Sequence, residues 1–280
     1  MLRGILLTCA LLFCAFPLLY LLAIQPDRES GAVRTIARSR VVHIPFTTLV
    51  TPNKDETTGK PMDTLLVSEG GSDELPEGPA GFDIFEDGSF LIADPLRQRL
   101  AVFDANGKFL RALNIGFAAD DVTITRPDSI QVRQATTGDI YAVDRTGRPS
   151  LKGRTQESET RKAHLLSGTT GEVEKRTPAG APLKVTFNKP GLRLLSIESL
   201  ATDDEGNTYV ALEATASGPV VDVRKYVRRY SADGKLVSEI SDIPLDYYVR
   251  PVDEFRVRKG VLYHMSPARS ELQINEWDMR

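Results

Sequence analysis

Short apolar runs recur along the chain, and each opens with a glycine that follows a polar turn. Each run has the length of a β-strand and contains β-branched or aromatic residues, which favour strands over helices. A glycine at such a turn supplies the positive φ angle that a tight hairpin requires. The four runs are residues 88–94, 138–144, 206–212 and 260–266.

A strand-like run precedes each glycine, and a second hairpin follows in three of the four segments. The preceding runs are residues 82–85, 129–133, 199–202 and 254–257, and the second hairpins are 99–110, 163–174 and 225–237. The unit is therefore four antiparallel strands, and its repetition is typical of a β-propeller. The sequence predicts an all-β fold, an antiparallel β-propeller with four clear blades over residues 41–280.

The two ends of this domain are expected to share a blade. The last repeat stops at residues 277–278, after its third strand, and residues 64–67 form a strand-like run just before the first repeat. Pairing the N-terminal strand with the C-terminal blade would remove two open sheet edges. Residues 41–50 form another such run, which extends that blade or belongs to a degenerate fifth one.

At residues 79–113, which read PAGFDIFEDGSFLIADPLRQRLAVFDANGKFLRAL, the chain resembles the NHL-repeat family. The other three repeats are similar to it more weakly. The resemblance implies a propeller that binds proteins, RNA or other ligands. A minority of related propellers are enzymes, including an amidating lyase and calcium-dependent lactonases. The chain departs from the family in blade count, because NHL propellers usually have about six blades.

The N-terminal segment is predicted to direct the chain to a membrane. Residues 4–24 are uncharged and almost wholly apolar after a short basic start. This length suits a membrane span of about 20 residues better than the apolar region of a signal peptide, about 7–15 residues. We expect a hydrophobic helix in residues 1–25, as an uncleaved signal anchor or a cleaved signal peptide. Residues 26–40 would form a polar tether.

The orientation follows from two opposing signals. Four arginines just after the apolar run favour a cytoplasmic C-terminal side by the positive-inside rule. A first apolar segment near the N-terminus is, however, the usual export signal. We expect export, with the propeller periplasmic or extracellular, and secretion if the segment is cleaved.

Composition narrows the function classes. Lys and Arg number 35 against 38 Asp and Glu, giving a net charge of −3. Nucleic acid is therefore not an expected partner, because its binding domains usually carry a clear basic excess. Cys9 and Cys14 both lie in the apolar run. A disulfide framework and a cysteine-based zinc site are thus excluded from the predicted propeller.

No catalytic set, metal site or cofactor site is predicted. The three histidines, His43, His164 and His264, have no metal-ligand spacing, and no nucleophile elbow, phosphate loop or dinucleotide fingerprint occurs. Residues 203–207 (DDEGN) are rich in carboxylates, but Asp, Asn and Gly at this place favour an ordinary turn over a calcium loop.

A binding role is favoured, through loops on one face of the propeller. The connections between second and third strands are the long ones, above all residues 145–162. Long loops on a rigid scaffold are the usual place for binding. The expected partner is a protein or an acidic polysaccharide, and the alternative function is a propeller-type hydrolase or lyase, with or without a metal. The candidate binding residues are Arg97, Arg99, Arg145, Arg148, Lys152, Arg154 and Arg269.

Overall fold

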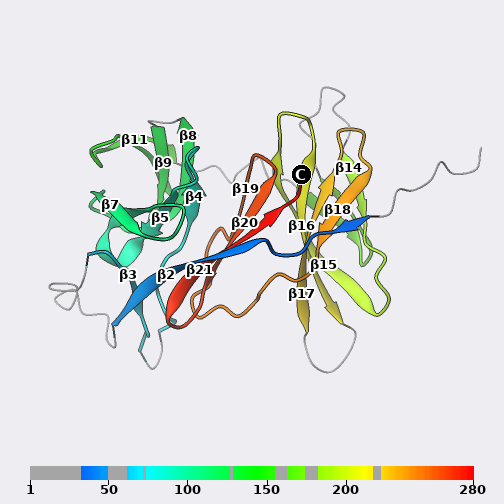
Figure 1. The fold of residues 1–280 in the computed structure, drawn as a ribbon, viewed down its shortest axis with the longest axis horizontal. Coiled ribbons are helices and arrows are strands. Elements are labelled where there is room, and N and C mark those ends of the chain that lie inside the picture. Colours follow the sequence, from blue (N-terminus) through cyan, green and yellow to red (C-terminus); the bar gives the residue numbers. More distant parts are fainter. Residues whose placement is uncertain are drawn as a thin grey trace, which may run out of the picture. The chain divides into compact units, whose positions relative to one another are not determined.

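The computed structural model describes residues 33–49, 62–71, 74–126, 129–154, 163–173, 182–216 and 222–280. The predicted N-terminal helix lies outside these residues. Within them, no helix has the length and apolarity needed to cross a membrane. Arg34–Arg280 form one unit, whose strands are shown in Figure 1.

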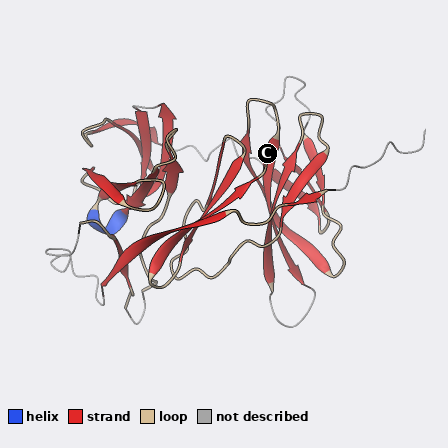
Figure 2. Ribbon diagram, viewed as in Figure 1, coloured by secondary structure: helices blue, strands red, loops and turns tan. Residues whose placement is uncertain are grey.

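The described chain is almost entirely β-structure, arranged as five small sheets that are the blades of a propeller (Figure 2). Neighbouring strands within each blade are mostly consecutive in sequence and antiparallel. The fold class predicted from the sequence is therefore confirmed. A 3-10 helix, η2 (Pro95–Arg97), interrupts the strands.

The first two blades each have four strands. Blade 1 consists of β4 (Phe82–Ile84), β5 (Phe90–Asp94), β6 (Arg99–Phe103) and β7 (Phe109–Asn114). Blade 2 consists of β8 (Ala119–Arg126), β9 (Ser129–Gln134), β10 (Asp139–Val143) and β11 (Pro149–Arg154).

The next two blades come from the middle of the chain. Blade 3 consists of β12 (Ala163–Ser167), β13 (Thr170–Val173) and β14 (Leu183–Thr186). Blade 4 consists of β15 (Leu192–Thr202), β16 (Thr208–Ala216), β17 (Val223–Tyr230) and β18 (Leu236–Ile240), with the short N-terminal β1 (Arg34–Thr35) added in parallel to β18.

The fifth blade joins the two ends of the chain. It consists of β19 (Phe255–Arg258), β20 (Val261–Pro267), β21 (Glu271–Asp278), β2 (Arg40–Leu49) and β3 (Leu65–Ser68). The N-terminal chain thus completes the C-terminal blade, but β2 is the strand that pairs with β21, and β3 adds in parallel outside β2. Because β1 also pairs within blade 4, the fold begins before residue 41.

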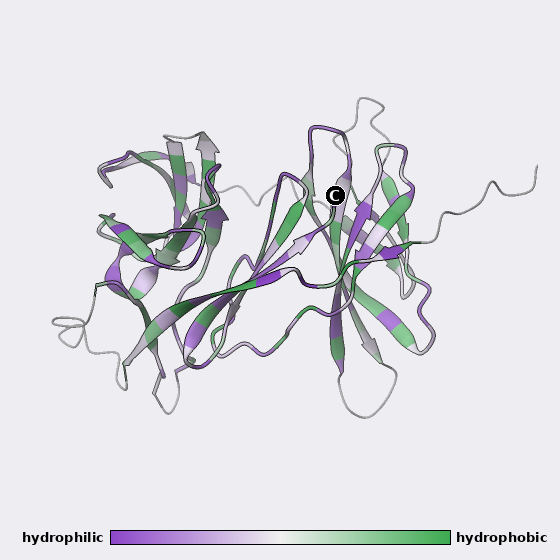
Figure 3. Cartoon of the chain, viewed as in Figure 1, coloured by the Kyte–Doolittle hydropathy of each residue, from purple (hydrophilic) through white to green (hydrophobic). Residues whose placement is uncertain are grey.

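Blades 1, 5 and 4 are packed on both faces, which explains their apolar runs in the sequence. Along β5 the side chains of Phe90 and Ile92 enter one core cluster, whereas Leu91 and Ala93 enter the next, as the period of two in a strand requires. Four such clusters fill the seams between blades 2 and 1, 1 and 5, 5 and 4, and 4 and 3. Apolar and polar positions follow one another along most strands in Figure 3.

The structure corrects the sequence prediction in the second repeat. The hairpin at Gly138 joins the second and third strands of blade 2, because β8 precedes it as the first strand. The hairpin at 163–174 belongs to a separate sheet, blade 3, so this region and not residues 41–50 supplies the fifth blade. The expected long loop at 145–162 therefore begins with a tight turn and the strand β11.

Candidate binding site

A large cavity of about 1110 Å³ lies at the turns that join first and second strands. Blades 1, 4 and 5 contribute these turns, at residues 84–89, 201–204 and 257–261. Apolar side chains line part of the wall, among them Phe85, Tyr263 and Leu110, the last of which is 54% exposed. A cavity with this mixture of apolar and polar walls suits ligand binding.

The turn of blade 5 projects two cations into this cavity. Lys259 and Gly260 both adopt positive φ angles, 49° and 75°. Two consecutive positive φ angles are typical of the type I′ turn, whose twist matches that of the flanking strands. The turn places Arg258 and Lys259 in the cavity wall.

Charges of both signs surround the cavity. The cations come from blades 1, 2 and 5 and the C-terminus, whereas the carboxylates sit in the first turns of blades 1 and 4. These residues are Arg111, Arg145, Arg258, Lys259 and Arg280, and Glu86, Asp87, Asp203 and Asp204. Hydrogen bonds from Ser89 lower the pKa of Asp87, so that carboxylate stays ionised at neutral pH.

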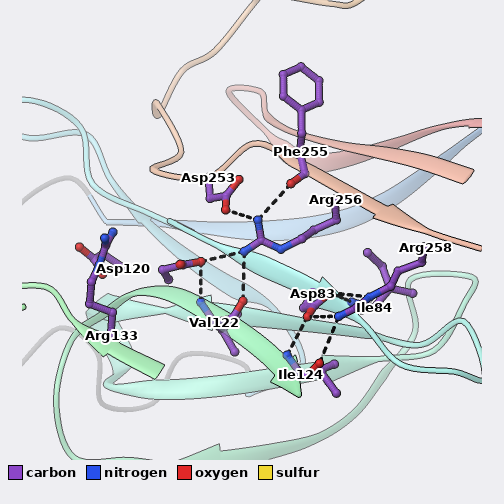
Figure 4. Close-up of polar contacts among 11 residues, drawn as sticks. Asp83, Ile84, Asp120, Val122, Ile124, Arg133, Asp253, Phe255, Arg256 and Arg258 are labelled. Carbon is purple, nitrogen blue, oxygen red and sulfur yellow. Dashed lines mark hydrogen bonds and ion pairs between the residues drawn. The ribbon is translucent and has the colours of Figure 1, made fainter. Parts of the chain in front are cut away.

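A network of ion pairs lies beneath the cavity and joins the first strands of three blades (Figure 4). Asp83 of β4 is fully buried and accepts hydrogen bonds from Arg258, at 3.2 Å to Nε and 2.6 Å to Nη2. The backbone N–H groups of Ile84 and Ile124 also donate to this carboxylate, at 2.8 and 2.7 Å. Asp83 therefore fixes the guanidinium of Arg258 against β8.

Arg256, two residues earlier on β19, makes a second junction with β8. Its Nη2 donates to Asp121 at 2.8 Å and to the carbonyl of Val122 at 3.1 Å, and its Nη1 pairs with Asp253. Burial would lower the pKa of Arg256, but the carboxylates of Asp253 and Asp121 raise it above its ordinary value. Asp121 is thus part of the strand β8 and of the scaffold.

A second, smaller cavity of about 240 Å³ lies against blades 4 and 5 and contains a continuous chain of polar contacts. Lys225 pairs with Glu213 at 3.2 Å and with Glu254. Tyr247 donates to Glu254, and its hydroxyl lies 2.8 Å from Nε2 of the fully buried His264. Each of these charged groups is therefore paired with, or hydrogen-bonded to, another residue of this cluster.

Arg97 and Arg99, two of the predicted binding residues, are buried. The side chain of Arg99 is 0% exposed and donates to Asp94 at 2.8 Å and to the carbonyl of Thr64 at 2.7 Å. Arg97 is 5% exposed and pairs with the same carboxylate at 3.6 Å. Both guanidinium groups therefore fasten the chain before β4 to blade 1 rather than face a partner.

The other predicted binding residues are exposed, but the structure does not bring them together. Arg145 lines the large cavity. Arg148, Lys152 and Arg154 lie along the turn before β11 and on β11 itself. Arg269 belongs to the β20–β21 turn, with its guanidinium 6.0 Å from the ring of Tyr248. That these residues bind a partner remains a prediction.

The carboxylate-rich segment 203–207 forms a turn. Asp203 accepts hydrogen bonds from the backbone of Asn207 at 2.8 Å and from the hydroxyl of Tyr209 at 3.0 Å. These bonds direct the carboxylate to its own hairpin. In the part of the chain that the structure describes, no three His, Cys, Asp or Glu side chains are grouped so that they could hold a metal ion.

Neither a family model nor a curated protein matches this chain. Among solved structures it is similar to a glutaminyl cyclase from Myxococcus xanthus, with 12% identity, a TM-score of 0.38 and coverage of 88% of this chain and 98% of that one. It is also similar to a protein of unknown function from Bacteroides thetaiotaomicron, with 10% identity, a TM-score of 0.39 and coverage of 85% of this chain and 75% of that one. A streptogramin B lyase has 9% identity, a TM-score of 0.36 and coverage of 71% of this chain and 93% of that one. Likenesses this distant carry no argument about function.

Proposed function

We propose that this chain is a binding propeller that holds a segment of a partner protein in the large cavity. One observation carries the proposal: exposed cations from three blades, Arg111, Arg145 and Lys259, line one cavity, beside ion pairs that join the first strands of blades 1, 2 and 5. A site held by rigid elements loses little conformational freedom on binding, which favours affinity.

The walls favour a polypeptide over the other expected partner, an acidic polysaccharide. Carboxylates in the turns of blades 1 and 4 stand among the cations, and like charges facing each other across an interface oppose binding. A uniformly anionic polymer would meet this repulsion along its whole length. A polypeptide segment can instead offer charges of both signs, and apolar side chains for Phe85 and Leu110.

Delivery to a membrane is the second part of the proposal. The apolar run at residues 4–24 supports export, with the propeller tethered outside the cytoplasm or released after cleavage. Fusing residues 1–40 to a soluble reporter tests this part. We expect the reporter in the membrane fraction and accessible to protease from outside the cytoplasm; a soluble cytoplasmic reporter would contradict it.

Two charge-matched triple variants test the binding surface. In the first, Arg111, Arg145 and Lys259 are replaced by serine; in the second, Arg148, Lys152 and Arg154 are replaced in the same way. We expect the first to lose at least about tenfold in affinity for partners captured from membranes, with weakened salt dependence, since close charge pairs across an interface contribute about 1.5 kcal/mol or more. The second should capture them as the unchanged protein does. The reverse result would move the contact surface to β11.

The alternative function, a propeller-type hydrolase or lyase, is supported by the smaller cavity. Glu213, Glu254 and Lys225 line it, and acid–base catalysis uses such groups in a shielded site. Elemental analysis of the purified protein tests the metal-dependent form of this alternative. One tightly held divalent ion per chain would favour catalysis over binding.

A further inference from the structure

We infer that Arg258 is the anchor of the large cavity and that it receives the side-chain carboxylate of an Asp or Glu in the bound segment. This inference rests on the proposed function, because it takes the ligand to be a polypeptide. It adds the chemical group that the site recognises and the residue that recognises it.

The donors of Arg258 are divided between the scaffold and the cavity. Nε and Nη2 donate to Asp83, and Nη2 donates also to the carbonyl of Ile124 at 3.2 Å. Nη1 makes no hydrogen bond to the described part of the chain, and 41% of the side chain is exposed in the wall of the cavity. A guanidinium carries five N–H donors in a fixed plane. The two on Nη1 are therefore available to a ligand.

This guanidinium is held before any ligand arrives. Asp83 is fully buried and is itself fixed by two backbone N–H groups from different blades. A mobile arginine side chain on a protein surface loses rotamer freedom when it binds a ligand, which costs about 0.5–1.5 kcal/mol. Arg258 has lost this freedom during folding, as Figure 4 illustrates by the converging bonds from β4, β8 and β19.

The charges around Arg258 select for a single carboxylate rather than for an anionic polymer. Asp83 balances the charge of Arg258, and the other cations of the cavity, Lys259 among them, come from separate parts of the fold. The turns of blades 1 and 4 place Asp87 and Asp203 in the same cavity. A segment with one acidic side chain for Arg258, flanked by neutral or basic residues near Asp87 and Asp203, fits this arrangement of charges.

A random peptide library displayed on phage tests the inference while the natural partner is unidentified. The bait is the full chain, solubilised in detergent and immobilised, which contains the propeller at residues 34–280. We expect selected peptides to carry Asp or Glu at one position at least tenfold more often than unselected ones. Synthetic peptides with that residue changed to Asn or Gln should bind at least tenfold more weakly.

The decisive variant is Arg258→Lys, because a lysine ammonium can still pair with Asp83 but has no second edge of donors. We expect this variant to melt close to the unchanged protein and to lose the preference for the acidic residue. Arg258→Gln should lose it as well, and melting curves show whether that variant still folds. If Arg258→Lys keeps the tenfold preference, or if the selected peptides have no acidic position, Arg258 is not the anchor.

The outcomes separate this inference from the proposed function. If the serine variant of Arg111, Arg145 and Lys259 loses the peptides while Arg258→Lys keeps the acidic preference, the cavity binds but Arg258 does not read the carboxylate. If neither variant changes binding, or no peptide is enriched at all, both proposals fail. Polygalacturonate, used as a separate probe, should not compete with the peptides; full competition would replace the polypeptide by an acidic polysaccharide.

Discussion

Two charged clusters lie at cavities of this propeller, and they differ in what they leave available. Around the large cavity, Asp83 engages one edge of Arg258 and leaves Nη1 without a partner in the described part of the chain. At the small cavity, Lys225 is shared by Glu213 and Glu254, and Tyr247 links Glu254 to His264. The first cluster leaves N–H donors that a ligand can use, whereas the charged groups of the second pair with one another within the protein.

The difference separates binding from stability. A charged group that is satisfied internally contributes to holding blades together, and its loss leaves a partner buried without compensation. A charged group with an open edge contributes to recognition, because a ligand can complete its hydrogen bonds. We therefore expect the small-cavity cluster to control unfolding and the large-cavity cluster to control binding.

The largest effect is expected for Glu254→Ala. This change leaves Lys225, 8% exposed, with Glu213 alone and removes the acceptor of Tyr247. Removing one partner of a buried pair costs about 3–5 kcal/mol, which urea unfolding would measure. Glu254→Gln, which keeps two polar atoms, is the control and should lose less. A loss below about 1 kcal/mol in Glu254→Ala would show that the cluster does not hold blades 4 and 5 together.

The second prediction is a loss of stability in acid. Burial opposes ionisation of Glu254, but hydrogen bonds from His264, Lys225 and Tyr247 lower its pKa to about 2. Its folded-state pKa thus lies below the unfolded value, so its contribution is present above about pH 4.5 and is lost as pH falls toward 2. The full contribution is on the order of 3 kcal/mol.

His264 adds to this loss at a higher pH. Its burial lowers the pKa of the imidazole, so the unfolded chain takes up the proton first and stability begins to fall below the ordinary histidine pKa of about 6.5. Free energies of unfolding measured in urea from pH 8 to 3 should show both steps in the unchanged protein. The variant His264→Gln should lack the step at higher pH. If its free energy of unfolding falls between pH 7 and 5 as steeply as that of the unchanged protein, the assignment to His264 is wrong.

A smaller effect on stability, joined to an effect on binding, is expected for Asp83→Asn. An amide retains part of the hydrogen bonding to Ile84 and Ile124 but no longer pairs with Arg258. Because Arg258 is partly exposed and can be hydrated, we expect a loss of about 1–2 kcal/mol. The freed guanidinium should bind acidic peptides more weakly, by a few fold. Equal affinity in calorimetric titrations would show that Asp83 does not position Arg258 for binding.

The repeats were predictable because blades 1, 4 and 5 are packed on both faces, so strands such as β5 and β16 appear as apolar runs between turns. Blade 3 was missed for the opposite reason. All six residues of β11 are exposed, and a strand without buried positions leaves no hydrophobic pattern. The residues of β11 were therefore assigned to a loop, and the hairpin that follows, which belongs to blade 3, was assigned to blade 2.

The candidate site was less accessible to sequence reasoning than the fold. Arg99 begins β6 and Arg258 ends β19, yet one is fully buried and the other lines a cavity. Their partners, Thr64 for Arg99 and Asp83 for Arg258, lie 35 and 175 residues away. A contact across such a separation depends on how the blades assemble, and no local pattern reports it. The turns at Gly88, Gly206 and Gly260 were predicted, because a positive φ is a local requirement, but binding was expected at the connections between second and third strands and not at these turns.

The smallest change in stability is expected where both clusters are left untouched, in the serine variant of Arg148, Lys152 and Arg154. The one ion pair it breaks within the described residues, between Arg154 and Asp139 at 3.1 Å, has its arginine 72% exposed, and exposed pairs of this kind contribute little to stability. The melting temperature should stay within a few degrees. β11 is, however, the edge of its sheet, and charges on an edge strand oppose pairing with another molecule. We therefore expect this variant to self-associate at concentrations where the unchanged protein does not, as measured by light scattering. A large fall in melting temperature with no self-association would show instead that these side chains pack against a neighbouring part of the fold.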